Sequence, residues 1–299
     1  MSTMNYQIVS DGSCDLPREL TDRLGITVVP FYVSFDDVNY QKEMVDIEVR
    51  EFYRQMVEKK GVYPKSSMPS IQDYADVFKP IIKAGEAVIC ICITTKFSGS
   101  MQSALNAKAM LLEEYKDAEI TIIDATINTV LQGIYVLEAA ALKERGASYE
   151  ESVKRLEEIK STGRIFFTVG DMSYLKHGGR IGKLTGIAGS VLGIKPLITL
   201  KQGEIFPSGI TRSRKKSMDK VIELLLDYLH ENKADMKDYS LAVGFGYDKS
   251  EAEDFKKEVL EVLKKEKFPL EDIPMYQIGA TIGVHTGPYP IGLGIIHRA

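Results

Sequence analysis

The first half of the 299-residue chain alternates short apolar runs with amphipathic segments. Residues 87–93 form an unbroken apolar run, which is typical of a strand covered on both faces. Residues 46–60 and 70–83 instead repeat apolar side chains at helical spacing. This alternation predicts a mostly parallel sheet with helices packed around it. The predicted strands are 7–10, 26–35, 87–93 and 119–123, and the predicted helices are 18–24, 46–60, 70–83, 101–115, 129–145 and 149–160.

The pattern changes after Gly163, where strands become shorter and glycine becomes frequent. Predicted strands follow at 164–169, 240–246 and 275–278, with a hairpin of 194–200 and 204–207 and helices at 217–232 and 251–266. The chain is also longer than one hydrophobic core usually serves. We therefore expect an α/β domain over residues 1–160 and a smaller α+β domain over residues 161–299, facing each other across a cleft.

Composition and charge narrow the class of protein. The formal charge of −4 argues against a generic nucleic-acid surface, which is normally basic. The three cysteines, Cys14, Cys90 and Cys92, form no disulfide framework and no CxxC metal pair. The N-terminal residues lack the pattern of a signal peptide, and no apolar run approaches the length of a membrane span. These features predict a cytoplasmic protein without a nucleic-acid partner.

Common catalytic and cofactor motifs are missing from the sequence. No stretch matches the phosphate-binding loop GxxxxGK[ST], the nucleophile elbow GxSxG or the zinc motif HExxH. Of the four histidines, His177 and His285 lie in glycine-rich stretches without an acidic partner at a suggestive spacing. We therefore expect no metal and no cofactor.

Three polar, loop-like segments remain as candidates for a site. "PKSSMPS" spans 64–70, "TTKFSGS" follows the apolar strand at 94–100, and "GATIGVHTGPYPIGLG" spans 279–294. The second segment lies where ligands bind in open α/β sheets, and amides at the start of the next helix favour a carboxylate or phosphate. Helix caps and turns explain the first two segments equally well. The third predicts a tight, rigid loop around His285, in which close approach to a ligand is the stronger interpretation.

The order of the motifs resembles the DegV family. "VSDGSCDLP" at 9–17 is similar to the family's opening DSxxDLP, "KSSMPS" to TSxPS and "ITTKFSGSMQSA" to SSxLSGTYQSA. "YLKHGGRI", "GIKPLITLKQGEI" and "GVHTGPYPIGLG" resemble its YLxxGGRI, KPI…DGxI and GxHxGPGxxG motifs. The match covers nearly the whole chain. The resemblance implies a two-domain fold that binds a long-chain fatty acid, such as palmitate, between and within the domains.

The resemblance also implies a set of site residues. Ser66 falls on a carboxylate-binding Thr of the family, Ser98 on its SG serine beside Gly99, His285 on the loop histidine and Arg180 on the GGRI arginine. Hydroxyl donors, helix-start amides and a histidine can satisfy a carboxylate without a full counter-charge. Phe97 and Tyr289 depart from the family pattern and are expected to narrow the lid or tunnel.

Three functions remain open from the sequence. In the first, the protein is no enzyme itself but presents a fatty acid to a separate fatty acid kinase subunit, with transient membrane contact permitted. In the second, it binds lipid for transport or sensing and has no kinase partner. In the third, it is a hydrolase that uses Ser98 with His285, although the sequence offers no third group for a triad.

Overall fold

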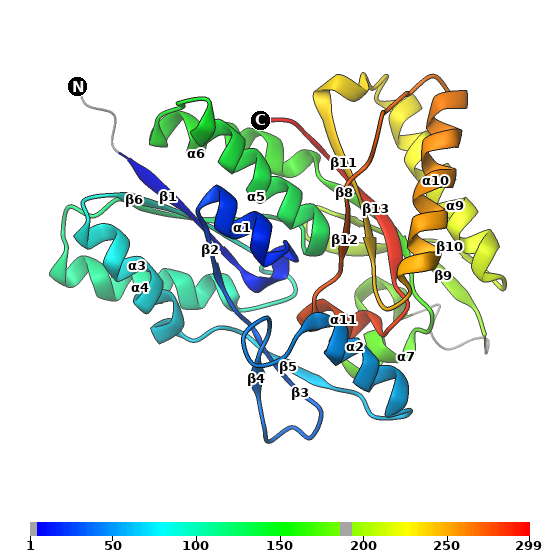
Figure 1. The fold of residues 1–299 in the computed structure, drawn as a ribbon, viewed down its shortest axis with the longest axis horizontal. Helices are drawn as coiled ribbons and strands as arrows, with labels where there is room; N and C mark the ends of the chain where they lie inside the picture. Colours follow the sequence, from blue (N-terminus) through cyan, green and yellow to red (C-terminus); the bar gives the residue numbers. More distant parts are fainter. Residues whose placement is uncertain (1–4, 186–192) are drawn as a thin grey trace.

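The computed structural model describes residues 5–185 and 193–299 and contains two large sheets that lie side by side (Figure 1). The first sheet has the order β2-β1-β6-β7, and all its neighbouring strands are parallel. Its strands are β1 (Tyr6–Asp11), β2 (Ile26–Val29), β6 (Ala87–Cys92) and β7 (Ile120–Asp124). The predicted parallel sheet is therefore confirmed.

The second sheet is mixed and has the order β10-β9-β8-β13-β11-β12, in which only β11 and β12 pair in parallel. Its strands are β8 (Arg164–Thr168), β9 (Lys195–Lys201), β10 (Glu204–Thr211), β11 (Tyr239–Phe245), β12 (Met275–Gln277) and β13 (Ile291–His297). The predicted combination of a parallel α/β half with a second, differently built half is confirmed. The predicted hairpin at Gln202 and Gly203 joins β9 to β10.

Helices cover both outer faces and fill the space between the sheets (Figure 1). Apolar side chains of α3 (Ile71–Lys83) and α4 (Ser100–Glu114) pack on the first sheet, and those of α9 (Arg214–Glu231) and α10 (Lys249–Lys265) pack on the second. Between the sheets, α5 (Thr129–Glu144) and α6 (Tyr149–Ile159) share one core with both of them. Because α5 has apolar side chains on nearly all sides, its position between two sheets removes most of them from water.

A small antiparallel sheet, β4-β3-β5, lies below the two large ones with α2 and α11 (Figure 1). Its strands are β3 (Tyr32–Ser34), β4 (Gln41–Lys42) and β5 (Lys65–Ser67), and the helices are α2 (Val49–Glu58) and α11 (Ala280–Thr286). The remaining elements are α1 (Arg18–Leu24), α7 (Ser173–His177) and the 3-10 turns η1 (Gly12–Cys14), η2 (Lys160–Thr162), η3 (Gly182–Leu184) and η4 (Met236–Asp238).

Three sequence predictions need correction here. Residues 26–35 are not one strand, because Pro30 lacks an amide hydrogen and the chain leaves the first sheet there to form β3 of the small sheet. Residues 64–70 contain the short strand β5 rather than a continuous loop. Residues 279–294 are not one rigid loop either, since they form α11 and the start of β13.

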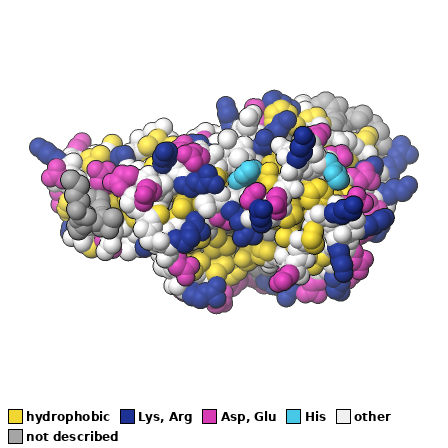
Figure 2. Space-filling view, turned by 90° about the horizontal axis from the view of Figure 1, so that it is seen from above, with side chains coloured by type: hydrophobic (Ala, Val, Ile, Leu, Met, Phe, Trp, Pro, Cys, Tyr) yellow, Lys and Arg dark blue, Asp and Glu magenta, His cyan; other side chains and the backbone are white. Residues whose placement is uncertain are grey.

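The surface carries charges of both signs. On the face seen in Figure 2, basic and acidic side chains are interspersed, and hydrophobic side chains gather toward the middle. In the described part of the chain, no helix combines the length and apolar character required to cross a bilayer.

Candidate functional site

A cavity of about 310 Å³ lies between the two large sheets. Residues of the second sheet, of β5 in the small sheet, of the segment that follows β6, and of α5 and α11 line it. All five residues predicted from the sequence are among them. These are Ser66, Ser98, Gly99, Arg180 and His285. Residues as far apart as 66 and 285 in the sequence are therefore brought to one site, although their role in binding stays a prediction.

The first sheet reaches the cavity at a topological switch point. From β1 the chain continues to β2 on one side, while β6 lies on the other side, so the order of the strands reverses between β1 and β6. Ligands in open α/β sheets bind outside the carboxyl ends of strands at such a point. Ile93, Phe97 and Ser98, which follow β6, line the cavity as this rule predicts.

Asp11, the last residue of β1, holds the segment that follows β6. Its carboxylate accepts hydrogen bonds from the Ile93 amide at 2.9 Å, from Ser100 Oγ at 2.8 Å and from Gln132 Nε2 at 2.8 Å. Burial raises the pKa of Asp11 to about 6, even though these donors favour its charged form. Asp11 thus fixes both ends of the turn that carries Ser98 and Gly99.

Ser98 lies just before α4 and has a hydroxyl with two available functions. Its Oγ accepts a hydrogen bond from the Ser100 amide at 3.2 Å, which satisfies one of the unpaired amides at the start of the helix. Because the oxygen acts there as an acceptor, the hydroxyl hydrogen remains able to donate to a ligand. The cap that the sequence suggested as an alternative and a binding role are compatible. Gly99 next to it leaves room for the Met68 side chain, which a Cβ would contact at 2.8 Å.

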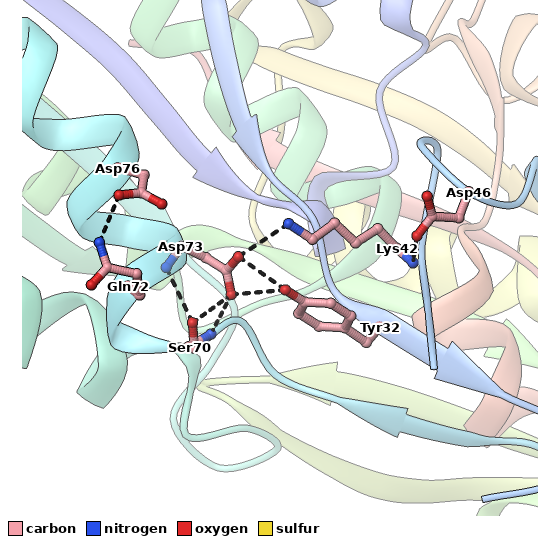
Figure 3. A network of polar contacts seen from close by, with 7 residues as sticks. All are labelled: Tyr32, Lys42, Asp46, Ser70, Gln72, Asp73 and Asp76. Carbon is pink, nitrogen blue, oxygen red and sulfur yellow. Dashed lines mark hydrogen bonds and ion pairs between the residues drawn. The ribbon is translucent and has the colours of Figure 1, made fainter. Parts of the chain in front are cut away.

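Ser66 reaches the cavity from β5, and a polar network attaches that strand to α3. Ser70 is the N-cap of α3 and forms a reciprocal capping box with Asp73. Tyr32 Oη from β3 donates to Asp73 at 2.9 Å, and Lys42 Nζ from β4 lies 3.3 Å from the same carboxylate (Figure 3). This network attaches β3 and β4 to α3. Because β5 pairs with β3, it also fixes the position of the strand that contains Ser66.

His285 lies in the last turn of α11, and its Nε2 is 3.2 Å from Ser66 Oγ. Its Nδ1 is buried beside Gly178 and has no hydrogen-bond partner in residues 5–185 and 193–299. Burial and the nearby Arg180 guanidinium lower the pKa of His285 to about 4. The imidazole is therefore neutral at physiological pH and can donate from one nitrogen only.

Arg180 supplies positive charge at the exposed end of the cavity. Its guanidinium donates to the Phe97 carbonyl at 3.1 Å and to the Gly178 carbonyl at 2.7 Å. The bond to Phe97 connects the segment after α7, from the second half of the chain, with the segment after β6, from the first half, while the bond to Gly178 stays within the segment after α7. An anion bound beside Ser98 would lie near this cation without requiring a buried ion pair.

The remainder of the cavity is mainly apolar. Its apolar lining comes from Phe31, Ile93, Phe97, Val130, Leu131, Ile165, Phe167, Leu175, Leu200, Ile205, Ile278 and Ile282. Phe97 lines the cavity, and its expected narrowing effect stays a prediction. Tyr289 does not line it and stacks against Gly170 instead, which corrects the expectation for that residue. A molecule with a long apolar body and one anionic end fits this distribution.

The Ser98–His285 pair that a hydrolase would use is not formed. His285 contacts Ser66 instead, and no carboxylate of the described residues orients its Nδ1. A serine nucleophile needs a base that a third group holds in place. The arrangement lacks that group.

The sequence and the fold are similar to those of one protein family. Residues 5–298 match the family described as "Uncharacterised protein, DegV family". Protein DegV of Bacillus subtilis is 30% identical over 291 residues, covering 97% of this chain and 98% of that protein. A stearic acid-binding protein from Eubacterium ventriosum has 43% identity and a TM-score of 0.92, with 98% of each chain covered. A fatty-acid-binding DegV family protein from Thermus thermophilus has 28% identity and a TM-score of 0.84, covering 98% of this chain and all of that one.

Proposed function

Because the chain belongs to the DegV family, we propose that it binds one long-chain fatty acid in the cavity between its two large sheets. The observation that carries this proposal is the cavity itself, which is apolar along most of its lining and polar at the Ser66–Ser98–His285 end. Its volume of about 310 Å³ lies in the range of roughly 300–1,000 Å³ found for small-molecule sites. The stearic acid-binding relative supports the same ligand class.

In this proposal the carboxylate lies between Ser66, Ser98 and Arg180. The two hydroxyls donate hydrogen bonds, and the guanidinium provides charge from a position already fixed by the Phe97 and Gly178 carbonyls. Hydrogen bonds to a charged acceptor are stronger than neutral ones. Neutral His285 supports the Ser66 hydroxyl rather than forming an ion pair. Residues 1–160 and 161–299 act as two domains that enclose the acyl chain.

The test is a titration of delipidated protein with stearate, methyl stearate and stearyl alcohol. All three have the same acyl body, but only stearate has an anionic head group. We expect stearate to bind at least about 10- to 150-fold more tightly, because each hydrogen bond to a charged group contributes roughly 1.5–3 kcal/mol. Equal affinities would mean that the polar end does not recognise a carboxylate, and no binding of any of them would refute the proposed function.

The role we favour for this binding is to present the carboxylate to a separate kinase subunit that phosphorylates it. Gly99 and Arg180, beside the proposed carboxylate, are both exposed, so a partner protein can reach the head group. Affinity capture from a cytoplasmic extract, followed by an assay for ATP-dependent acyl-phosphate formation, tests this role. Acyl-phosphate formed only when both proteins are present supports it. Lipid binding without any such activity favours transport or sensing.

A further inference from the structure

Glu43, which follows β4, caps the N-terminus of the helix that carries His285. Glu43 is buried, with 3% of its surface exposed. Its carboxylate accepts hydrogen bonds from the Ala280 amide, from the Thr281 amide at 3.2 Å and from Thr281 Oγ1 at 2.7 Å. The first amides of a helix have no partner within the helix, so a carboxylate there is stabilising. Glu43 therefore attaches the start of α11 to the segment that follows β4, in addition to the apolar packing of Ala280 with Val33 of β3.

Asp15 lies against the same helix end. Its Oδ2 accepts a hydrogen bond from Thr129 Oγ1 at 2.5 Å, while its Oδ1 is shielded from solvent and has no partner among the described residues. A Cβ on Gly279 would overlap both Asp15 Oδ1 and Glu43 Oε1, so the two carboxyl groups lie close together on the same side of this glycine. Thr129 has a φ of 51°, a left-handed conformation that is rare for a β-branched residue and marks a constrained position.

The surroundings do not neutralise two negative charges. In the parts of the chain that the structure describes, no Lys, Arg or His side chain forms a salt bridge with Asp15 or Glu43. No group of three or more His, Cys, Asp or Glu side chains in these parts is placed to hold a metal ion. The titratable and charged groups nearby are Asp11 and Cys14 beside Asp15, Tyr53 from α2, Glu48 and Arg50 on the adjacent small pocket, and Arg18, which donates to the Met44 carbonyl.

Electrostatics then favour a single negative charge on the pair. Burial, together with the charge of Glu43, holds the pKa of Asp15 well above its ordinary value, and burial raises the pKa of Glu43. The Tyr53 hydroxyl is buried and has no hydrogen-bond partner within residues 5–185 and 193–299, and its pKa is raised first by burial and then by both carboxylates. In two carboxyl groups that share one enclosed site, the charge on one disfavours ionisation of the other.

We propose that Asp15 and Glu43 share one proton and act as positioning residues for the fatty-acid site, because they fix the helix that places His285 in the cavity. This inference rests on the proposed function. Thr281, Ile282, His285 and Thr286 of α11 all line the cavity, so a displacement at the start of the helix reaches the binding site directly. When rising pH removes the shared proton, the two charges beside Gly279 repel each other and α11 loosens.

The experiment measures stearate affinity of the delipidated protein between pH 6 and pH 10. The wild-type affinity is expected to fall by up to about tenfold per pH unit once the shared proton is lost, since binding then requires its uptake. Asp15→Asn, which leaves only one ionisable group at this position, should flatten this fall. Glu48→Gln, which changes an exposed carboxylate that lines the adjacent pocket, should retain the wild-type slope.

A second readout does not depend on the lipid. The imidazole NMR signals of His285 in the lipid-free protein should shift over the same alkaline range in the wild type but not in Asp15→Asn. Glu43→Ala should lower stearate affinity at every pH, and Glu43→Gln, which keeps one acceptor oxygen, should restore part of it. If Glu43→Ala does not fold, the Asp15→Asn comparison still decides.

Two results would overturn the inference. The first is a wild-type affinity and a His285 signal that are both constant through the alkaline range, which would mean that no shared proton controls α11. The second is an Asp15→Asn variant with the wild-type slope, which would assign the titration to another group. Failure of the wild type to bind stearate at any pH would refute the proposed function instead, and the His285 signal would still test the shared proton.

Discussion

Removing the Ser98 hydroxyl tests the carboxylate site most informatively, because the structure gives this group two separable roles. Its oxygen accepts a hydrogen bond from the Ser100 amide, and its hydrogen is available to the ligand. Loss of a donor to a charged carboxylate costs about 1.5–3 kcal/mol, which corresponds to an affinity loss of roughly 10- to 150-fold. Loss of the helix-start contact costs typically about 1 kcal/mol of stability and does not by itself change affinity.

The assay therefore measures two quantities on the same Ser98→Ala protein. Isothermal titration of delipidated protein with palmitate gives the affinity, and the thermal midpoint of the lipid-free protein gives the stability. Ser98→Thr, which retains a hydroxyl, is the matched control and should keep most of the affinity. A Ser98→Ala protein with a lowered midpoint and unchanged palmitate affinity would show that Ser98 only caps α4, and the proposed site would be wrong.

Three further predictions concern Asp11, His285 and the acyl end of the cavity. Burial raises the pKa of Asp11 to about 6, above its unfolded value, so its contribution to the free energy of unfolding falls as pH rises from about 4 to 6. Urea unfolding of Asp11→Asn should show no such fall, and a pH profile identical to that of the wild type would contradict the prediction. The pKa of His285 is lowered to about 4, so its contribution to the free energy of unfolding is fully present above about pH 6.5 and is lost as pH falls toward 4. His285→Gln should remove this loss of stability in acid, and NMR titration of the wild-type imidazole checks the pKa directly. Leu131, which lines the cavity from α5, should limit acyl length when enlarged: each methylene that no longer fits costs about 0.8 kcal/mol, or about fourfold in affinity, so Leu131→Trp should weaken stearate binding more than laurate binding. An equal loss for both acids would refute that last assignment.

Much of the fold could be predicted because local patterns and long-range packing agree. The helix predicted at 18–24 is α1, and it ends at Gly25, whose φ of 63° is a left-handed conformation that glycine adopts readily. The continuous apolar run of β6 is buried on both faces, as its pattern indicated. The hydrophobic pattern predicted the wrong structure where tertiary contacts determine the strands. The strand expected over 26–35 breaks at Pro30, and β5 forms through backbone pairing with β3.

The residues of the candidate site could be predicted in part, where local sequence motifs mark them. Ser66, Ser98, Gly99, Arg180 and His285 were found through motif resemblance, and the structure brings all of them to one cavity. The side chains that hold these residues were missed. Asp11 and Glu43 act through hydrogen bonds to residues more than 80 positions away, which no local pattern encodes. The acidic residue at the end of β1 was the one available signal, since it stands at the carboxyl end of a predicted parallel strand.

The central claim is that this cavity holds a long-chain fatty acid, and the contents of the purified protein test it most directly. Extraction under denaturing conditions, followed by quantitative mass spectrometry, should recover about one long-chain fatty acid per chain, as expected for a single enclosed ligand site. The Ser66→Ala, Ser98→Ala double variant should retain clearly less. A wild-type protein that is consistently free of fatty acid, and that takes up none from an added fluorescent analogue, would contradict the account.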